Sequence, residues 1–438
     1  MVSGSPTNRQ WQSPHSAATP NREHNVRVMA TRKWVGRVGI TLVSLSLLSY
    51  VGMCVWLMAN QHRLVFGKHF PVVPIRESLG LQPKTVQVGT IGTLPLFAFS
   101  ISSLPADNSF NRWVVYFHGT DDNNTDTWDQ TDFHQLRDLG FHVLAPEYPG
   151  YSGKPGQSTE QIVEQEARIA YDYLRKTHNV PESNIVIFGT SLGTGVAVDL
   201  ASRVRAGALV LNAPQTSVIA LGRREYPFIP LSLLLVDRFE SDKKIPSVRM
   251  PVFIHHTLED KIIPFEQGRT LYELAGTPKH FEQGHGYHCQ HSYSFFVALQ
   301  QFLNESAGLN LRAPHKPISA VVAATLATEG LENAVAQYRE LRAHHGNEYN
   351  FAEYELNWLG RGLLEKGKQA DAIAILKLNA EQYPKSFDVY DSLGEAYLRT
   401  GEKEAAARSF QRSVQVYAGA DNYSRKKLDA LLVSTKNE

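Results

Sequence analysis

The stretch IVIFGTSLGTGVAVDLA (residues 185–201) joins two kinds of structure with one serine between them. Its first part is apolar and rich in β-branched residues, which predicts a buried strand, and a helical pattern follows Gly193. The junction, Gly189-Thr190-Ser191-Leu192-Gly193, is a G-x-S-x-G motif. A serine on so sharp a strand-to-helix turn projects its hydroxyl outward, and the flanking glycines leave room for the neighbouring backbone. The stretch therefore predicts that Ser191 is a nucleophile and that the Leu192 N–H, at the start of the helix, receives an oxyanion.

Strand patterns and helix patterns alternate around this turn. The stretch STEQIVEQEARIAYDYLRKT (158–177) has helical spacing, with a capping box if Ser158 is its N-cap. Short β-like pieces in 62–111 predict leading antiparallel strands. Strands separated by helices predict a mainly parallel, doubly wound α/β sheet with helices on both faces. The expected strands lie in RWVVYFHG (112–119), GFHVLAPEYPGYSG (140–153), NIVIFG (184–189), GALVLNAP (207–214) and MPVFIHH (250–256).

The N-terminal part of the chain predicts a membrane anchor. Residues 38–61, VGITLVSLSLLSYVGMCVWLMANQ, contain no charged side chain and are long enough to cross a bilayer. A buried helix of a soluble domain and a cleaved signal peptide are the alternatives. Residues 1–33, rich in Ser, Pro, Asn and Arg, predict a disordered basic tail. Because basic residues precede the span, we expect a single-pass protein of the plasma (inner) membrane, with a cytoplasmic N-terminus and its domains on the periplasmic, extracytoplasmic side.

Composition excludes several classes of protein. The formal net charge is +1 over 438 residues, which gives no reason to expect a nucleic-acid partner. Two cysteines, Cys54 and Cys289, are too few for a disulfide framework or a cysteine-rich zinc module. The cluster His285, His288, Cys289 and His291 also lacks the spacing of a zinc site. We therefore expect no cofactor and no metal.

The C-terminal part of the chain contains an internal repeat of 34 residues. Leu359-Gly360 recurs as Leu393-Gly394, and further pairs of residues follow at the same spacing. That period resembles tetratricopeptide repeats, in which pairs of helices pack through small residues. We expect an all-α helical-repeat domain over 318–435. The sequence leaves two roles open for it: binding of a protein partner, and packing against the rest of the chain.

The middle of the chain, over about residues 80–305, resembles the α/β-hydrolase fold. In particular it resembles membrane-anchored α/β-hydrolases with a serine aminopeptidase-like or lysophospholipase-like domain, in which a Q-x-x-L-x-F-like entry follows the span. The resemblance implies a hydrolase domain over 62–312 with a cap over about 215–247. The matching stretches are QHRLVFG (61–67), YFHG (116–119), EYPGYSG (147–153), GTSLG (189–193), MPVFIHHTLEDKIIP (250–264) and GHGYHCQ (284–290).

A nucleophilic serine needs a base, and the base needs an acid that fixes its tautomer. The resemblance places the acid at Asp260, after a late strand. Asp237 is the alternative acid, and Glu259 is expected to point to the other side. For the base, GYHCQH matches the family ending better at His288 than at His285, so His288 is preferred and His285 stays the alternative.

Two further positions complete the expected site. In the resembling enzymes the turn after His118-Gly119 donates the second oxyanion N–H, which here belongs to Thr120. We expect His291 to lie on the surface.

The sequence leaves three functions open. The first is a membrane-anchored serine hydrolase that forms an acyl-enzyme and cleaves carboxylic esters or thioesters of small acyl or lipid-like substrates. Because the expected cap is apolar, it either covers a bound acyl chain or simply packs on the sheet, and the sequence leaves both roles open. The second function is a serine peptidase of the same fold. The third is a non-catalytic, membrane-tethered scaffold that uses the helical repeats.

Overall fold

The computed structural model describes residues 1, 22–67, 72–103, 111–120, 123–419 and 422–434. Within these residues, an eight-stranded sheet has the order β1-β2-β4-β3-β5-β6-β7-β8. The pairs β1/β2 and β2/β4 are antiparallel and the remaining pairs are parallel, so the predicted mainly parallel sheet with leading antiparallel strands is confirmed. The strands are β1 (Lys84–Ile91), β2 (Leu94–Ile101), β3 (Trp113–Phe117), β4 (His142–Glu147), β5 (Ile185–Thr190), β6 (Ala208–Asn212), β7 (Val252–Thr257) and β8 (Lys279–Gly284).

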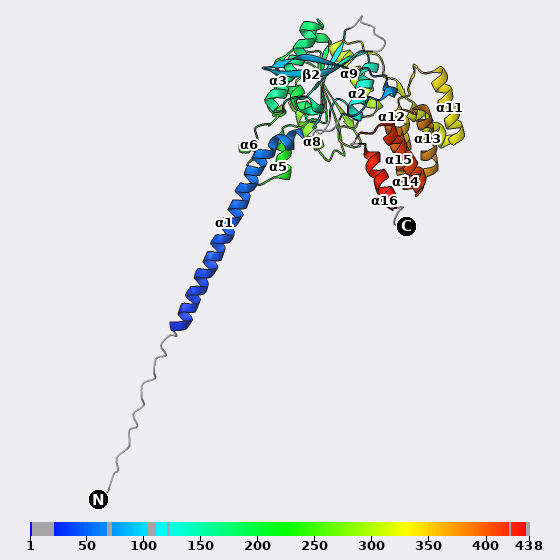
Figure 1. The fold of residues 1–438 in the computed structure, drawn as a ribbon. Coiled ribbons are helices and arrows are strands. Elements are labelled where there is room, and N and C mark those ends of the chain that lie inside the picture. Colours follow the sequence, from blue (N-terminus) through cyan, green and yellow to red (C-terminus); the bar gives the residue numbers. More distant parts are fainter. Residues whose placement is uncertain (2–21, 68–71, 104–110, 121–122, 420–421, 435–438) are drawn as a thin grey trace. The chain divides into compact units, whose positions relative to one another are not determined.

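Helices cover both faces of this sheet, as the alternating pattern predicts. Figure 1 shows α3 on one side of the strands and α2 and α9 on the other. The face of α3 (Glu160–Thr177) also carries α4 (Gly193–Arg203) and α8 (Phe265–Leu274). The opposite face carries α2 (Thr127–Asp138) and α9 (Tyr293–Ala307). The sheet is therefore the middle of three layers, and its central strands are buried from both sides.

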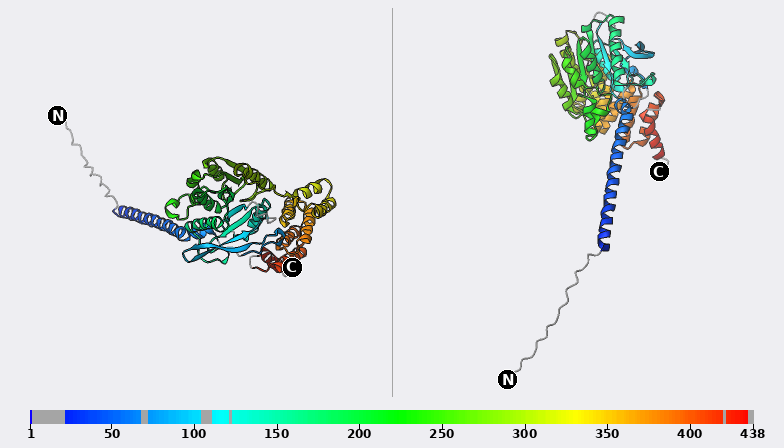
Figure 2. Two further views of the ribbon diagram at one scale, coloured as in Figure 1. Left: turned by 90° about the horizontal axis from the view of Figure 1, so that it is seen from above. Right: turned by 90° about the vertical axis from the view of Figure 1, so that its left-hand side faces the viewer.

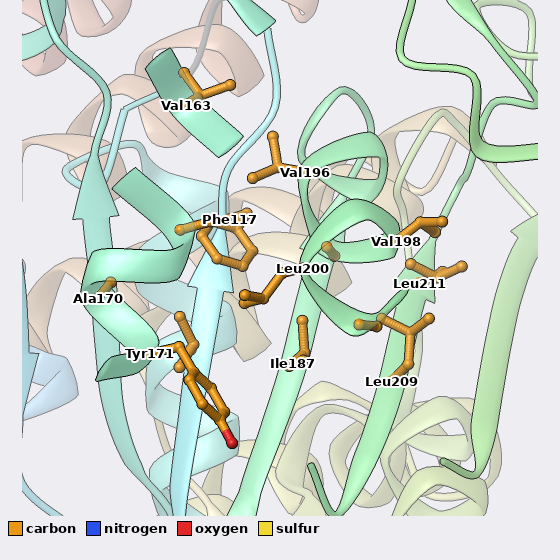
Figure 3. Close-up of a cluster of buried hydrophobic side chains, with 14 of the residues drawn as sticks. Phe117, Val163, Ala170, Tyr171, Ile187, Val196, Val198, Leu200, Leu209 and Leu211 are labelled. Carbon is orange, nitrogen blue, oxygen red and sulfur yellow. The ribbon is translucent and has the colours of Figure 1, made fainter. Parts of the chain in front are cut away.

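The largest apolar core lies between the sheet and α3 and α4. Figure 3 shows Ile187, Leu209 and Leu211 of the strands facing Val196 and Leu200 of α4. All five side chains are almost fully buried. This packing fixes the start of α4, and with it the turn that carries Ser191.

Two local predictions need correction. The N-cap of α3 is Thr159, whose side chain accepts a hydrogen bond from the Ile162 N–H, whereas Ser158 Oγ donates to the Pro149 carbonyl. Strand β8 was not predicted, because KHFEQG contains a single large apolar residue and the strand is only half-buried. The turn after β8 carries His288.

Short helices connect the strands. The segment between β6 and β7, where the cap is expected, contains α5 (Val218–Glu225), α6 (Leu231–Leu234), α7 (Ser241–Lys244) and the 3-10 helix η5 (Ile245–Ser247). The other 3-10 helices are η1 (Glu77–Leu79), η3 (Tyr151–Gly153) and η4 (Glu182–Asn184).

The N-terminal helix α1 (Arg22–Phe66) begins inside the expected tail, of which residues 2–21 lie outside the described residues. Its part Lys33–Phe66 is long and apolar enough to cross a membrane, a property that it shares with signal sequences. From Asn60 onward, the helix belongs to the same compact unit as the sheet.

The C-terminal helices repeat at the predicted period. Helices α12 (Glu353–Glu365) and α14 (Phe387–Arg399) begin 34 residues apart, as do α13 (Gln369–Gln382) and α15 (Lys403–Val416). Figure 2 shows the helices from α10 onward, coloured yellow to red, as a group of their own. Their assignment as tetratricopeptide repeats stays a prediction. The other elements here are β9 (Lys316–Pro317), α10 (Ile318–Thr328), α11 (Leu331–His344), β10 (Tyr349–Asn350) and α16 (Tyr423–Ser434).

The glycines of the repeat lie at the helix contacts. A Cβ on Gly360 would lie 2.5 Å from the Leu376 side chain, and one on Gly394 would lie 2.5 Å from Phe410. The same small-to-large contact therefore recurs in both helix pairs. Helix α12 also packs on the sheet domain, because Gln135 Nε2 donates to the Tyr354 hydroxyl at 2.8 Å.

Candidate active site

Ser191 lies on the turn between β5 and α4. Its φ is +50°, in the left-handed region that residues with side chains rarely adopt. Two backbone hydrogen bonds hold this conformation: the Ser191 N–H donates to the Asn212 carbonyl, and the Thr194 N–H donates to the Ser191 carbonyl, both at 3.0 Å. The side chain is only half-buried, so the hydroxyl is accessible at the carboxyl end of the sheet. Strain at one residue, paid for by surrounding contacts, is typical of functional sites.

The two glycines of the motif have the role that the sequence predicts. A Cβ on Gly189 would lie 2.5 Å from the Gly193 carbonyl oxygen. A Cβ on Gly193 would overlap the Phe117 carbonyl oxygen at the end of β3. Because both obstacles are backbone atoms, which cannot rotate away, neither position accepts a larger residue without movement of a strand or helix.

The structure brings His288 and Asp260 to this serine. His288 Nε2 lies 2.9 Å from Ser191 Oγ, and His288 Nδ1 lies 2.7 Å from Asp260 Oδ2. Since a carboxylate can only accept, Nδ1 carries the proton and Nε2 accepts from the serine hydroxyl. Asp260 follows β7 and His288 follows β8, so the three side chains meet at the carboxyl edge of three parallel strands.

The carboxylate of Asp260 is held in one orientation by three hydrogen bonds and a further histidine ring, His256, whose Nε2 also donates to the Ile263 carbonyl at 2.9 Å. Its Oδ1 accepts from the backbone N–H groups of Ile262 and Ile263, each at 2.9 Å. Its Oδ2 faces the rings of His288 and His256, the latter at 3.3 Å. Burial raises the pKa of Asp260, but the hydrogen bonds from His256 and His288 outweigh burial and hold that pKa below its ordinary value. Asp260 is therefore ionised at neutral pH.

The alternative base and acid lie elsewhere. His285 has a side chain that is 74% exposed, and its Nδ1 pairs with Glu259 Oε1 at 3.0 Å. Glu259 thus points away from the serine, as expected. Asp237, the alternative acid, pairs with His62 at 2.6 Å, and its other oxygen accepts from the Glu160 N–H.

The expectation that His291 lies on the surface is wrong. Its side chain is buried, and Nε2 lies 2.7 Å from Asp132 Oδ1 in helix α2. Burial lowers the pKa of His291, but the Asp132 carboxylate more than offsets burial, so the net shift is upward. His285, His288 and His291 therefore point to three different carboxylates.

The two expected oxyanion donors occupy the turns next to the serine. Leu192 is the N-cap of α4, where a backbone N–H has no partner within the helix. Thr120 lies just beyond β3, and its hydroxyl donates to the Val65 carbonyl at 3.1 Å. Behind Thr120, the buried His118 ring packs against Tyr148, whose hydroxyl donates to the His118 carbonyl at 3.1 Å.

A buried acid, Glu147, lies next to the His118 ring. His118 Nε2 lies 3.5 Å from Glu147 Oε1, and burial lowers the pKa of His118 to about 4. Burial raises the pKa of Glu147 to about 7, and burial also raises the pKa of Glu166 well above its ordinary value. Burial thus shifts all three groups toward their uncharged forms, because a low-dielectric interior disfavours charge.

Sequence reasoning missed three residues that position the site. Asn212, at the end of β6, accepts from Ser191 through its carbonyl and donates through Nδ2 to the Cys289 carbonyl at 3.0 Å. It therefore ties the serine turn to the histidine turn. Thr257 donates to the Tyr287 carbonyl at 3.1 Å, and His256 contacts Asp260. Their position at the carboxyl ends of strands is the one sequence signal that could have found them.

Comparisons with known proteins agree with this architecture. Residues 114–277 match the alpha/beta hydrolase family. The chain is 39% identical over 146 residues to an uncharacterized protein of Mycobacterium tuberculosis, a match that covers 33% of this chain and 52% of that protein. It is 33% identical over 168 residues to the alpha/beta hydrolase domain-containing protein aho-3 of Caenorhabditis elegans, a match that covers 37% of this chain and 48% of that protein. Against the human alpha/beta hydrolase domain-containing protein 17B it is 29% identical over 174 residues, with 38% and 58% covered. The chain thus spans about half the length of these relatives.

Solved structures with similar folds include esterases and a peptidase. The esterase Pf2001 of Pyrococcus furiosus matches with a TM-score of 0.46 and 17% identity over 55% of this chain and 99% of that one. A puromycin-hydrolyzing peptidase of Mycobacterium tuberculosis matches with a TM-score of 0.46 and 15% identity over 53% and 40%. The family match over residues 114–277 and the strand order described above give the sheet domain the α/β-hydrolase fold, and the helices of the C-terminal part follow it in the chain.

Proposed function

We propose that this chain, whose sheet domain has the α/β-hydrolase fold, is a membrane-anchored serine hydrolase that cleaves ester or thioester bonds of lipid-like acyl substrates. The observation that carries the proposal is the unbroken line of hydrogen bonds from Ser191 through His288 to Asp260, with distances of 2.9 and 2.7 Å. The first distance lies within the reach required for proton transfer, and the second lets Asp260 orient the ring.

The geometry supports an acyl-enzyme reaction. His288 Nε2 takes the Ser191 proton as Oγ attacks the acyl carbon, and the carbonyl oxygen becomes an oxyanion. The tetrahedral intermediate collapses, the bond to the leaving alcohol or thiol breaks, and His288 returns the proton to that group. A water molecule, deprotonated by the same nitrogen, then attacks the acyl-enzyme and releases the acid and the free serine hydroxyl.

Asp260 acts through His288 rather than on the substrate. It keeps the Nδ1 proton in place, so that Nε2 faces the serine with its lone pair, and its negative charge stabilises the imidazolium that forms. The low pKa of Asp260 means that this charge is present across the physiological range.

The oxyanion is assigned to the backbone N–H groups of Leu192 and Thr120. The first also lies at the positive end of the α4 dipole. Each such donor contributes about 3 kcal/mol to the stability of the transition state.

We further propose that α1 anchors the enzyme as a single span, with a cytoplasmic N-terminus and the hydrolase and repeat domains on the extracytoplasmic side of the plasma (inner) membrane. The apolar part Lys33–Phe66 and the basic residues that precede the apolar run support this orientation.

The test uses full-length protein in detergent with three substrate sets: p-nitrophenyl esters of increasing acyl length, acyl thioesters, and aminoacyl amides. We expect hydrolysis of the esters and thioesters that is lost in Ser191→Ala. Turnover of the aminoacyl amides alone indicates a peptidase. If folded wild-type protein hydrolyses none of the three, the hydrolytic assignment is wrong and the chain is a tethered scaffold.

A further inference from the structure

The last turn of α1 is bound to the cap and to the candidate active site. Gln61 Oε1 accepts from the Val236 N–H at 2.7 Å, and His62 Nδ1 pairs with the buried Asp237 carboxylate at 2.6 Å. One turn later, the Val65 carbonyl accepts from the hydroxyl of Thr120, an expected oxyanion residue. The helix therefore does not end in a loose linker, because its final residues are part of the hydrolase domain.

The short segment between the apolar run and Val65 limits how far the site can lie from the end of that run. The apolar run extends to about residue 61, and residues 60–66 are helical and belong to the same compact unit as the sheet. At 1.5 Å per residue, Val65 lies only about 6 Å further along the axis. If α1 spans a bilayer, the Thr120 turn is within about one headgroup layer of the hydrocarbon. The ester groups of lipids lie at that depth.

Exposed apolar side chains gather at the same edge of the domain. Leu64 follows the apolar run, Leu233 and Val236 lie in the cap that α1 contacts, and Ile262 and Tyr287 lie in the turns after β7 and β8. Leu233 is 81% exposed, Val236 69% and Tyr287 77%. These turns and the cap all follow the carboxyl ends of parallel strands, so they share the edge that carries Ser191.

Basic side chains accompany this apolar set. Arg223 and Arg224 end α5 and are exposed, and Lys261 is exposed next to Ile262. Exposed apolar residues bordered by arginine and lysine are typical of protein faces that enter the headgroup region of a bilayer.

We infer that the cap helices α5–α6 and the turn at Ile262 lie in the surface of the bilayer that α1 crosses, so that the site receives acyl esters or thioesters directly from that leaflet. The inference rests on the proposed function for the anchor and the reaction, and it adds the source of the substrate. The exposed apolar residues are then covered by lipid rather than by water.

Photo-crosslinking tests the contact without any need for activity. The photoreactive residue p-benzoylphenylalanine replaces Leu233, Val236 or Leu432 in the full-length protein, in vesicles of phosphatidylcholine and phosphatidylglycerol. Leu432 is the matched control, because it is an exposed leucine on α16, and a label at Leu47 in the apolar run reports on the span.

We expect lipid adducts at 47, 233 and 236 and none at 432. Adducts at 47 alone overturn the inference but leave the anchor intact. The absence of adducts at 47 overturns the anchor and the inference together. Protein dimers crosslinked through residue 233 show that a second copy of the chain covers this face, and that result also overturns the inference.

A kinetic experiment separates this inference from the proposed function. We expect Leu233→Asp and Val236→Asp to lower hydrolysis of a long-chain acyl ester in vesicles at least tenfold. Hydrolysis of water-soluble p-nitrophenyl acetate should stay within twofold of the wild type, as should both rates in Leu432→Asp. If Leu233→Asp and Val236→Asp hydrolyse the vesicle substrate as fast as the wild type does, the inference alone is contradicted. If the wild type is inactive on both substrates, the proposed function is contradicted.

Discussion

Replacement of Asp260 by asparagine changes one atom of the site and reverses the direction of a hydrogen bond. In the wild type, the N–H groups of Ile262 and Ile263 lie 2.9 Å from Asp260 Oδ1, and the Oδ1 of an asparagine can accept the same two hydrogen bonds. Those two donors fix the amide so that its NH₂ group faces His288. His288 Nδ1 must then accept, and its proton moves to Nε2, which faces Ser191 Oγ. The histidine can no longer take the serine proton.

The size of the effect follows from this change of tautomer. The loss of the correct tautomer and of the charge beside the imidazolium lowers kcat by about 10⁴-fold in triads of this geometry. At about 1.4 kcal/mol per factor of ten, this is about 5.5 kcal/mol of transition-state stabilisation. The amide also lacks the negative charge that lies 3.3 Å from His256 Nε2, so a modest loss of stability should accompany the loss of rate.

The assay compares kcat for a p-nitrophenyl ester in Asp260→Asn and in Glu259→Gln, with circular dichroism to verify that both variants fold. Glu259 is the matched control because it is the adjacent acid and pairs with the exposed His285. We expect a rate within twofold of the wild type for Glu259→Gln. A loss below tenfold in folded Asp260→Asn, or an equal loss in both variants, refutes the reasoning.

Three further predictions concern the base, the turn and the buried acid. His288→Ala should lower kcat at least about 10⁴-fold, because it removes the ring that lies 2.9 Å from Ser191 Oγ. His285→Ala should leave kcat within twofold, and equal losses in the two variants contradict the assignment. Gly193→Ala should lower the free energy of unfolding by about 1–3 kcal/mol, because its Cβ meets the last carbonyl of β3, and an unchanged melting temperature would exclude that clash. Glu147 binds a proton in the folded state up to about pH 7, against an ordinary pKa of 4.5, so folding stability should fall as pH rises from 4.5 to 7. Glu147→Gln should remove the share of that slope that comes from Glu147, about 3 kcal/mol in total. If the unfolding free energies of the two proteins, measured with denaturant, change in parallel across this pH range, the assigned burial is contradicted.

The serine turn was predictable from a short stretch of sequence because its constraints are local. A buried strand, two glycines and a helix within 17 residues leave little freedom for Ser191. Asp260 and His288 came from resemblance to a family rather than from any local pattern. Spacing alone left two histidines as candidates for the base and two acids as candidates for its partner. The folded sheet distinguishes them, because it brings one of each to the serine.

The misses share a physical cause, which is that they depend on contacts between distant parts of the chain. His291 is buried because Asp132, on a helix far earlier in the sequence, supplies its counter-charge. Strand β8 is stabilised by pairing with β7 rather than by apolar residues of its own. Asn212 joins two turns that the sequence does not place side by side. No periodicity or motif encodes such contacts.

The central claim is that Ser191 Oγ is a nucleophile activated by His288. Treatment of the full-length protein with a fluorophosphonate probe, followed by tandem mass spectrometry of its peptides, tests that claim most directly. The account predicts one phosphonylated residue, Ser191, in wild type and in His285→Ala, and no adduct in folded His288→Ala. A probe adduct on another residue, or none on folded wild-type protein, contradicts it.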